Sequence, residues 1–221
     1  MDERAEEIQM RKLLAVATTI VLSLGVTTMK AQSLEQHEDF DQTKPGGLPA
    51  GWESGVTGSG KPKWAVAADS TAPSKPNVLK QSGSGTYPWV VKRDVAIIDG
   101  FVETRFKPIS GDEDQAGGIV WRFRNGRTYY VARANANENN VSLYYTTLGI
   151  RSTIKYVDAP VPSNVWHTLR AEFSGKKIRV LLNGKLYIEA NYEHIKDAGA
   201  VGVWTKADSV TAFDDFSYGA K

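Results

Sequence analysis

The stretch Gly111–Asn135, GDEDQAGGIVWRFRNGRTYYVARAN, decides the fold class. Two runs rich in aromatic and β-branched residues flank Asn125-Gly126, a pair typical of a two-residue type I′ turn, in which both central residues need positive φ. Pairing across this turn sets Arg122 opposite Tyr129, and side chains then alternate between two faces. The stretch therefore predicts an antiparallel hairpin.

One face of this hairpin is almost wholly apolar, so we expect it to lie in the core. The residues expected there are Ile119, Trp121, Phe123, Tyr130, Ala132 and Ala134. The opposite face combines Arg, Asn and Tyr, whereas a solvated sheet face is usually rich in Lys, Glu and Thr. Arg, Asn and Tyr offer planar donors, amides and flat rings, which suit a polyhydroxylated ligand.

The next strand continues this polar face, and an inert solvated face remains an alternative. The predicted ligand-binding residues, including one at the rim, are Arg122, Tyr129, Arg133, Asn135, Asn140, Tyr144 and Gln115.

The rest of the chain also has the pattern of an all-β protein. From Leu48 onward, turn signals recur about every 8–12 residues, the spacing of a sandwich or barrel. Asn183-Gly184 is a second hairpin signal. The Gly/Pro/Ser-rich segments Lys44–Lys63 and Ser70–Asn77 are predicted to be long surface loops.

Composition excludes several classes of protein and site. The chain has 221 residues, a formal net charge of +2 and no cysteine. So small a charge does not favour nucleic acid or an anionic membrane as partner. The lack of cysteine excludes disulfides, thiolate zinc sites and a cysteine nucleophile.

The N-terminal residues 1–31 are predicted to be a secretory signal. Arg11 and Lys12 form a basic start, and the uncharged run Leu13–Val26 is too short to span a bilayer. The acidic leader before Met10 does not suit a signal, so we expect translation to begin at Met10. Residues 32–221 would then form one exported domain, periplasmic or extracellular.

Two stretches resemble the concanavalin A-like lectin/glucanase superfamily: DQAGGIVWRFRNGRTYYVARANANENNVSLYY, from Asp114, and VGVWTKADSVTAFDDFSYG, from Val201. They look most like the bacterial domain grouped as 3-keto-disaccharide hydrolase-like or laminin-G-like. The resemblance covers essentially all of Phe40–Gly219. It implies a two-sheet antiparallel jelly-roll sandwich with a concave face that often binds sugar.

The acidic trio Asp112, Glu113 and Asp114 has three interpretations. It can be a bare turn, a calcium loop without the EF-hand spacing, or a source of catalytic acids. The E-x-D-x-x-E motif of family 16 glucanases, which the resemblance would bring, is absent from the sequence. Asp114 and Glu138 are the candidate catalytic acids if the protein is an enzyme.

The resemblance also implies a structural Ca²⁺ between the N-terminal segment and the last strand. A carboxylate on a mostly apolar strand face is costly unless it is hydrogen-bonded or metal-bound. The candidate ligands are Asp214, Asp215 and Asp41. The alternative is an aspartate that accepts a hydrogen bond from a backbone amide.

Together these observations predict an exported, non-catalytic carbohydrate-binding domain whose partner is a saccharide or polysaccharide. One alternative is a glycoside hydrolase that acts on a disaccharide or keto-sugar derivative. Another is a laminin-G-like module with a protein partner.

Overall fold

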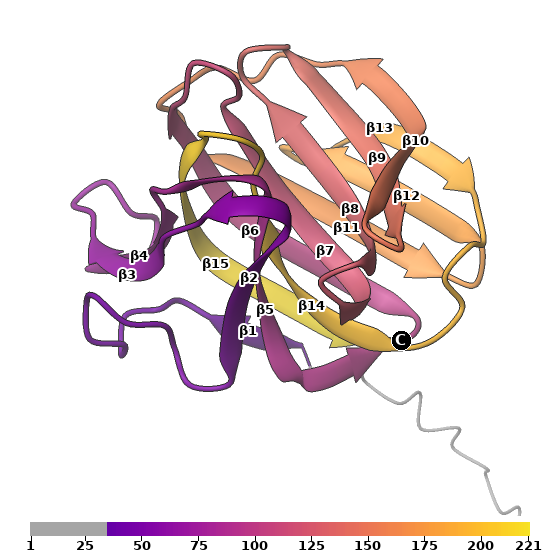
Figure 1. Ribbon diagram of the computed structural model, residues 1–221, viewed down its shortest axis with the longest axis horizontal. Helices are drawn as coiled ribbons and strands as arrows, with labels where there is room; N and C mark the ends of the chain where they lie inside the picture. The colour runs from indigo at the N-terminus through magenta and orange to yellow at the C-terminus, as the bar shows by residue number, and fades with distance from the viewer. Residues whose placement is uncertain (1–34) are drawn as a thin grey trace, which may run out of the picture. The chain divides into compact units, whose positions relative to one another are not determined.

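Residues 35–221 are described by the computed structural model, which Figure 1 shows as two layers of strands. No helix occurs among these residues, and so none that is long and apolar enough to cross a membrane. The strands are β1 (Gln36–Glu38), β2 (Trp52–Lys61), β3 (Trp64–Ala68), β4 (Asn77–Gln81), β5 (Ser84–Ile97), β6 (Gly100–Ser110), β7 (Ala116–Asn125), β8 (Thr128–Asn135), β9 (Asn140–Thr147), β10 (Ile150–Asp158), β11 (His167–Ser174), β12 (Lys177–Leu182), β13 (Lys185–Asn191), β14 (Gly199–Trp204) and β15 (Val210–Ala220).

These strands form two antiparallel sheets packed face to face. The eight-stranded sheet has the order β13-β12-β11-β6-β15-β4-β3, and β1 also pairs with β15. The seven-stranded sheet has the order β10-β9-β8-β7-β14-β5-β2. Consecutive strands such as β6 and β7 lie in different sheets, so the chain crosses between the layers. The predicted two-sheet antiparallel jelly-roll sandwich is confirmed.

Aromatic side chains fill the space between the sheets. The Trp121 ring stacks at 5.5 Å on Tyr130 and at 5.5 Å on Phe173, which comes from the opposite sheet. Each such buried ring contributes roughly 1.5–3 kcal/mol by leaving water. The sheets approach so closely that a Cβ on Gly117 would lie 2.3 Å from the Phe106 ring, so this position requires glycine.

The predicted β7–β8 hairpin exists, but its tip differs from the expectation. Trp121 pairs with Tyr130 as expected, while Asn125 pairs with Thr128, which puts the turn one residue later. A β-bulge between Trp121 and Asn125 takes up two extra residues of β7, and Arg122 there has a positive φ of 45°. A bulge reverses the face on which the following side chains lie.

The predicted surface loop at Lys44–Lys63 is wrong in its second half, where β2 forms an edge of the seven-stranded sheet. Its sequence is rich in glycine because the strand bends sharply. Gly58 and Gly60 have φ values of 89° and 132°, and they lie at a bulge between Thr57 and Gly60. The segment Ser70–Asn77 is irregular until β4 begins, as expected.

Candidate functional site

The outer face of the seven-stranded sheet is concave because the sheet curls. The Arg151 guanidinium on edge strand β10 lies 4.6 Å from the ring of Tyr87 on β5, across the sheet. Thr57 on the other edge strand, β2, lies 2.8 Å from the Tyr129 hydroxyl on β8. In Figure 1, β2 and β10 come forward on either side of the central strands. We call this surface the concave face.

Aromatic rings close the middle of the concave face. Trp204 stacks on Tyr87 at 5.6 Å, and Phe123 stacks on Tyr129 at 5.3 Å. Tyr129 is 0 % exposed and Tyr144 5 %, so neither offers a free ring for stacking on a sugar. Burial raises the pKa of the Tyr129 phenol, which therefore stays protonated.

Polar side chains gather at one end of the concave face, beyond these rings. Arg133 donates to Asp114 at 3.4 Å and to Glu138 at 2.5 Å through its two terminal nitrogens. It also donates to Asn140 at 3.0 Å, while Asn135 donates to Asp114 at 2.5 Å. We call these five residues the polar cluster. Three of the predicted ligand-binding residues therefore lie together, with both candidate acids.

Glu138 and Tyr156 stand where the polar cluster meets solvent. The amide of Asn140 donates to Glu138 at 2.6 Å and to the Tyr156 hydroxyl at 2.8 Å. Burial alone would raise the pKa of Glu138, but the Asn140 hydrogen bond and the Arg133 charge outweigh it and hold that pKa below its usual value. Glu138 is therefore ionised near neutral pH.

The acidic turn between β6 and β7 is held by a carboxylate from a distant loop. Asp208 accepts hydrogen bonds from the backbone amides of Asp112 at 2.7 Å, Glu113 at 3.1 Å and Asp114 at 3.1 Å. Burial alone would raise the pKa of Asp208, and these three amides more than offset it, so the pKa is lowered. The turn is thus a structured anchor that fixes the Asp114 backbone.

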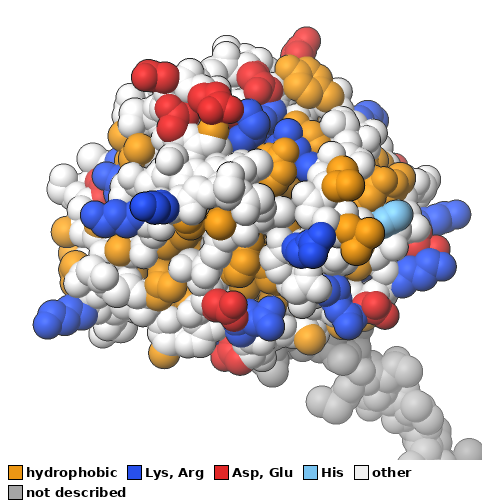
Figure 2. Space-filling view, viewed as in Figure 1, with side chains coloured by type: hydrophobic (Ala, Val, Ile, Leu, Met, Phe, Trp, Pro, Cys, Tyr) orange, Lys and Arg blue, Asp and Glu red, His pale blue; other side chains and the backbone are white. Residues whose placement is uncertain are grey.

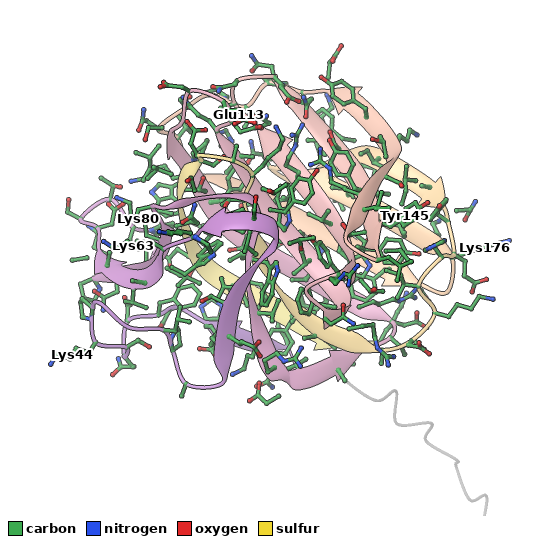
Figure 3. All side chains as sticks on the ribbon, viewed as in Figure 1. Lys44, Lys63, Lys80, Glu113, Tyr145 and Lys176 are labelled. Carbon is green, nitrogen blue, oxygen red and sulfur yellow. The ribbon has the colours of Figure 1, made fainter. Side chains whose placement is uncertain are left out.

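Lys206 and Gln115 complete this end of the concave face. Lys206 donates to the second carboxylate oxygen of Asp114, which is 0 % exposed. Gln115 donates to the Gly111 carbonyl at 3.2 Å and accepts from Ser163, so it ties two loops together at the rim. Figure 2 shows acidic side chains along the upper edge of this face with basic ones between them, and Figure 3 places Glu113 at that edge.

Arg122 does not lie on the concave face, and its predicted place there is wrong. The bulge turns its guanidinium to the inner side, 6.0 Å from the Tyr130 ring, where it donates to the Ile98 carbonyl at 2.8 Å and the Ile195 carbonyl at 2.7 Å. It also pairs with Asp99 at 3.3 Å. The same bulge moves Phe123 from its predicted core position to the concave face.

Three residues of this face, Tyr87, Arg151 and Lys206, were not predicted from the sequence, and neither was Asp208, which anchors the turn beside it. Tyr87 belongs to β5 and Arg151 to β10, two strands that were not predicted. Lys206 and Asp208 lie in the β14–β15 loop, TKADS, whose contacts with the β6–β7 turn join residues more than 90 positions apart. The signal that could have pointed to them is the pair of opposite charges beside the strand end at Trp204.

The candidate calcium ligands do not fit a metal site in this arrangement. Asp214 accepts hydrogen bonds from the Ser74 hydroxyl at 2.7 Å, the Ser74 amide at 2.9 Å and the Asp215 amide at 2.8 Å. Asp41 accepts from a backbone amide, and Asp215 pairs with Arg105 at 3.3 Å. Within residues 35–221 no group of three or more acidic, His or Cys side chains could hold a metal ion. These contacts favour the alternative to calcium, an aspartate that accepts hydrogen bonds from backbone amides, and removal of metal ions tests the calcium prediction.

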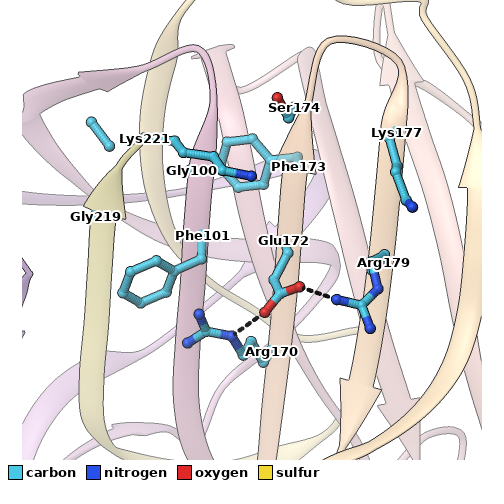
Figure 4. A pocket seen from close by; sticks show the side chains of 11 residues that line it. Gly100, Phe101, Arg170, Glu172, Phe173, Ser174, Lys177, Arg179, Gly219 and Lys221 are labelled. Carbon is cyan, nitrogen blue, oxygen red and sulfur yellow. Dashed lines mark hydrogen bonds and ion pairs between the residues drawn. The ribbon is translucent and has the colours of Figure 1, made fainter. Parts of the chain in front are cut away.

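A separate pocket of about 450 Å³ lies on the outer face of the eight-stranded sheet (Figure 4). Its side chains pair with one another: Glu172 accepts from Arg170 at 3.0 Å and from Arg179 at 2.6 Å, and Arg170 lies 4.0 Å from the Phe101 ring. None of the predicted site residues lines it. The charges of Arg170, Glu172 and Arg179 are thus compensated by one another, and the outer face of an antiparallel sheet can be solvated without binding a ligand.

The chain is similar in structure to several solved proteins, although no family model or curated protein matches its sequence. The carbohydrate-binding module CBM66 from Bacillus subtilis matches with a TM-score of 0.62 and 18 % identity, over 76 % of this chain and 94 % of the module. A Bacillus licheniformis β-glucanase matches with a TM-score of 0.58 and 14 % identity, over 85 % and 98 %. The Emp47p carbohydrate recognition domain matches with a TM-score of 0.51 and 13 % identity, over 82 % and 92 %.

Proposed function

The protein has a concanavalin A-like fold, and we propose that it binds a saccharide at the polar end of the concave face. The observation that carries this proposal is the polar cluster itself. Arg133 is 2 % exposed, and its Nε has no hydrogen-bond partner among residues 35–221. A buried donor without an acceptor is costly, which marks this end of the face as unlike the rest of the packed protein. At its solvent edge the Glu138 side chain is 39 % exposed and Tyr156 is 50 % exposed, so the hydroxyl groups of a ligand can reach these two residues.

Two of the structural neighbours, a carbohydrate-binding module and a carbohydrate recognition domain, support a role in binding. The third neighbour is a glucanase, so the fold alone does not separate binding from cleavage. That separation must come from the carboxylates of this chain.

The state of these carboxylates supports binding without cleavage. Glycoside hydrolysis requires a carboxylic acid that is protonated near neutral pH. The lowered pKa of Glu138 leaves it ionised, and Asp114 accepts from three side chains, of which Arg133 and Lys206 are cationic. We propose that both carboxylates orient donors toward a bound sugar.

Glycoside hydrolysis is the second candidate function. The carboxylates of Asp114 and Glu138 bind the two terminal nitrogens of the Arg133 guanidinium, so the two candidate acids lie near each other. Incubation of the protein with disaccharides and keto-disaccharides tests it. Turnover that is lost in Glu138→Gln, in a variant that remains folded, would replace the binding proposal with this one.

Export is part of the proposal. The predicted signal, residues 1–31, lies outside the described residues, so its support is the sequence pattern. Mass spectrometry of the protein from a secreting host should find a mature N-terminus at Gln32. An N-terminus upstream of Arg11 would contradict both the signal and the initiation at Met10.

A glycan-array screen tests the binding proposal, with Asn140→Ala as the site variant. Asn140 bridges Glu138 and Tyr156 at the solvent edge of the polar cluster, so its loss should weaken binding about tenfold or more. Asn183→Ala is the matched control, since Asn183 lies in the β12–β13 turn of the other sheet. Binding that is equal in both variants would move the site away from the concave face.

A further inference from the structure

Arg151 holds an unusual position on the concave face. Its guanidinium lies 4.3 Å from the ring centroid of Tyr144, 4.6 Å from that of Tyr87 and 5.9 Å from that of Trp204. The two tyrosines come from strands β9 and β5, which the curl of the sheet brings together. Contacts of this kind fix the guanidinium in place.

The cations of the concave face differ in whether a carboxylate pairs with them. Two of its cations, Arg133 and Lys206, pair with the carboxylates of Asp114 and Glu138. The side chain of Arg151 forms no ion pair or hydrogen bond with any residue of the described range 35–221, and its Nη1 is buried. The aromatic rings attract the Arg151 cation, but they do not accept hydrogen bonds from the N–H groups in the plane of its guanidinium. The positive charge of Arg151 therefore lacks an anionic partner.

Tyr144 connects this cation with the polar cluster. Its ring lies 5.6 Å from the Arg133 guanidinium and 4.3 Å from that of Arg151. Each arginine has one buried nitrogen without an acceptor, Nε in Arg133 and Nη1 in Arg151. Two unpaired donor groups therefore lie near one ring, next to the end of the face where we propose that the saccharide binds.

We propose that the saccharide is anionic and that Arg151 binds its charged group, a carboxylate or a sulfate. This inference rests on the proposed function. A guanidinium binds such groups through two parallel hydrogen bonds, which are stronger than those to a neutral hydroxyl. One unpaired cation corresponds to one anionic group on the bound sugar unit, as in a uronic acid or a monosulfated sugar. Tyr87 and Tyr144 then act as positioning residues that hold the guanidinium.

Binding of matched charged and neutral oligosaccharides to the full chain tests this inference. The probes are an oligogalacturonate and its methyl ester, and a sulfated galactan oligomer and its desulfated form. We expect one charged probe to bind roughly tenfold to a hundredfold more tightly than its neutral partner, because charge-assisted hydrogen bonds are about twice as strong as neutral ones. The charged member that shows this preference identifies the anionic group.

Three variants locate the effect. Arg151→Gln should reduce the preference to about onefold, and Arg151→Lys should keep part of it, since lysine retains the charge but loses the planar fork. Arg124→Gln, the matched control, removes an arginine on β7 that is exposed and paired with Asp197 at 3.1 Å, and it should keep the full preference. A thermal melt of each variant checks that it is folded. If Arg151→Gln does not fold, Arg151→Lys is used in its place to measure the role of Arg151.

The outcomes separate the two proposals. A charged preference that survives in Arg151→Gln would overturn the role of Arg151. Binding of neutral and charged probes alike would overturn the anionic class and leave the binding proposal standing. Failure to bind any saccharide, on the array as with these probes, would overturn the proposed function itself.

Discussion

Asp208 shows how a single carboxylate can organise a binding surface that it does not itself line. It accepts three consecutive backbone amides of the acidic turn, and Asp114, the third of these residues, contacts Arg133 and Lys206. The orientation of the polar cluster thus depends on a residue 94 positions away in sequence from Asp114.

Replacement of this carboxylate should therefore affect both stability and binding. In Asp208→Asn the side-chain amide cannot accept hydrogen bonds at one of its two positions, so we expect the free energy of unfolding to fall by about 1–3 kcal/mol. Saccharide affinity should fall too, because Asp114 loses its fixed backbone. Asp197→Asn, at an exposed acid, is the control for loss of charge. Chemical denaturation and the array measure the two effects, and a variant with unchanged stability would contradict the anchoring role.

Asp214 should give the protein a distinctive pH dependence. Burial raises its pKa from 3.8 to about 6, so the folded state binds this proton more tightly than the unfolded chain does. The stabilisation is fully present below about pH 4 and is lost as the pH rises through about 6. The change is at most about 3 kcal/mol.

Denaturation of wild type and Asp214→Asn from pH 4 to 7 isolates this contribution. Asp69, Glu138, Glu172 and Asp208 have lowered pKa values and act in the opposite direction, so only the difference between the two proteins is informative. The variant should gain stability relative to wild type as the pH rises. A constant difference across this range would show that Asp214 titrates normally.

Two β-bulges lie at the positions where strict alternation of side chains no longer predicts the sheet face on which a residue lies. Arg122 and Asp215 are non-glycine residues with positive φ, 45° and 46°, and each lies at a bulge. Upstream of its bulge, the β7–β8 register and the core placement of Trp121 were predicted correctly. Beyond it, Phe123 lies on the opposite face. Nothing in the local sequence marks an arginine or aspartate as a bulge residue, because tertiary contacts stabilise it.

A substitution of Arg122 tests whether its tertiary contacts stabilise the β7 bulge. Its guanidinium satisfies backbone carbonyls of Ile98, Gly175 and Ile195 at the end of the sandwich. Arg122→Ala removes the donor to these carbonyls, while Asp99 keeps the hydrogen bond from the Gly175 amide, so we expect a loss of about 1–3 kcal/mol in the free energy of unfolding. Saccharide affinity, measured below the melting temperature, should not change. A weaker affinity would return Arg122 to the ligand-binding set.

At the scale of the whole molecule, the layered fold could be predicted and the curl of one sheet could not. Turn spacing and alternating hydrophobicity predicted an all-β chain, the β7–β8 hairpin with the strand that follows it, and the β12–β13 hairpin at Asn183-Gly184. The curl arises from contacts between strands remote in sequence, such as Tyr87 with Arg151. It therefore buried the predicted ligand-binding residues Tyr129 and Tyr144, and also Arg133, Asn135 and Asn140, so that Glu138 and Tyr156 are the residues at the solvent edge of the polar cluster.

Removal of divalent metal ions tests the calcium prediction on the intact protein. The hydrogen bonds that Asp214 accepts from Ser74 and Asp215 already satisfy its carboxylate. We therefore expect EDTA to leave the melting temperature within about 1 °C of its value in calcium. A fall of several degrees, reversed by added calcium, would establish a structural ion, since a ligand that binds only the folded state stabilises it.

The inward turn of β2 and β10 also affects how this protein behaves at high concentration. A straight, flat edge strand offers unpaired backbone groups to a second chain, and such edges promote intermolecular aggregation. Here both edges of the seven-stranded sheet carry a bulge, between Thr57 and Gly60 in β2 and between Thr153 and Lys155 in β10. Neither edge presents a regular template for strand addition, so the curl that shapes the binding surface also disfavours aggregation through this sheet.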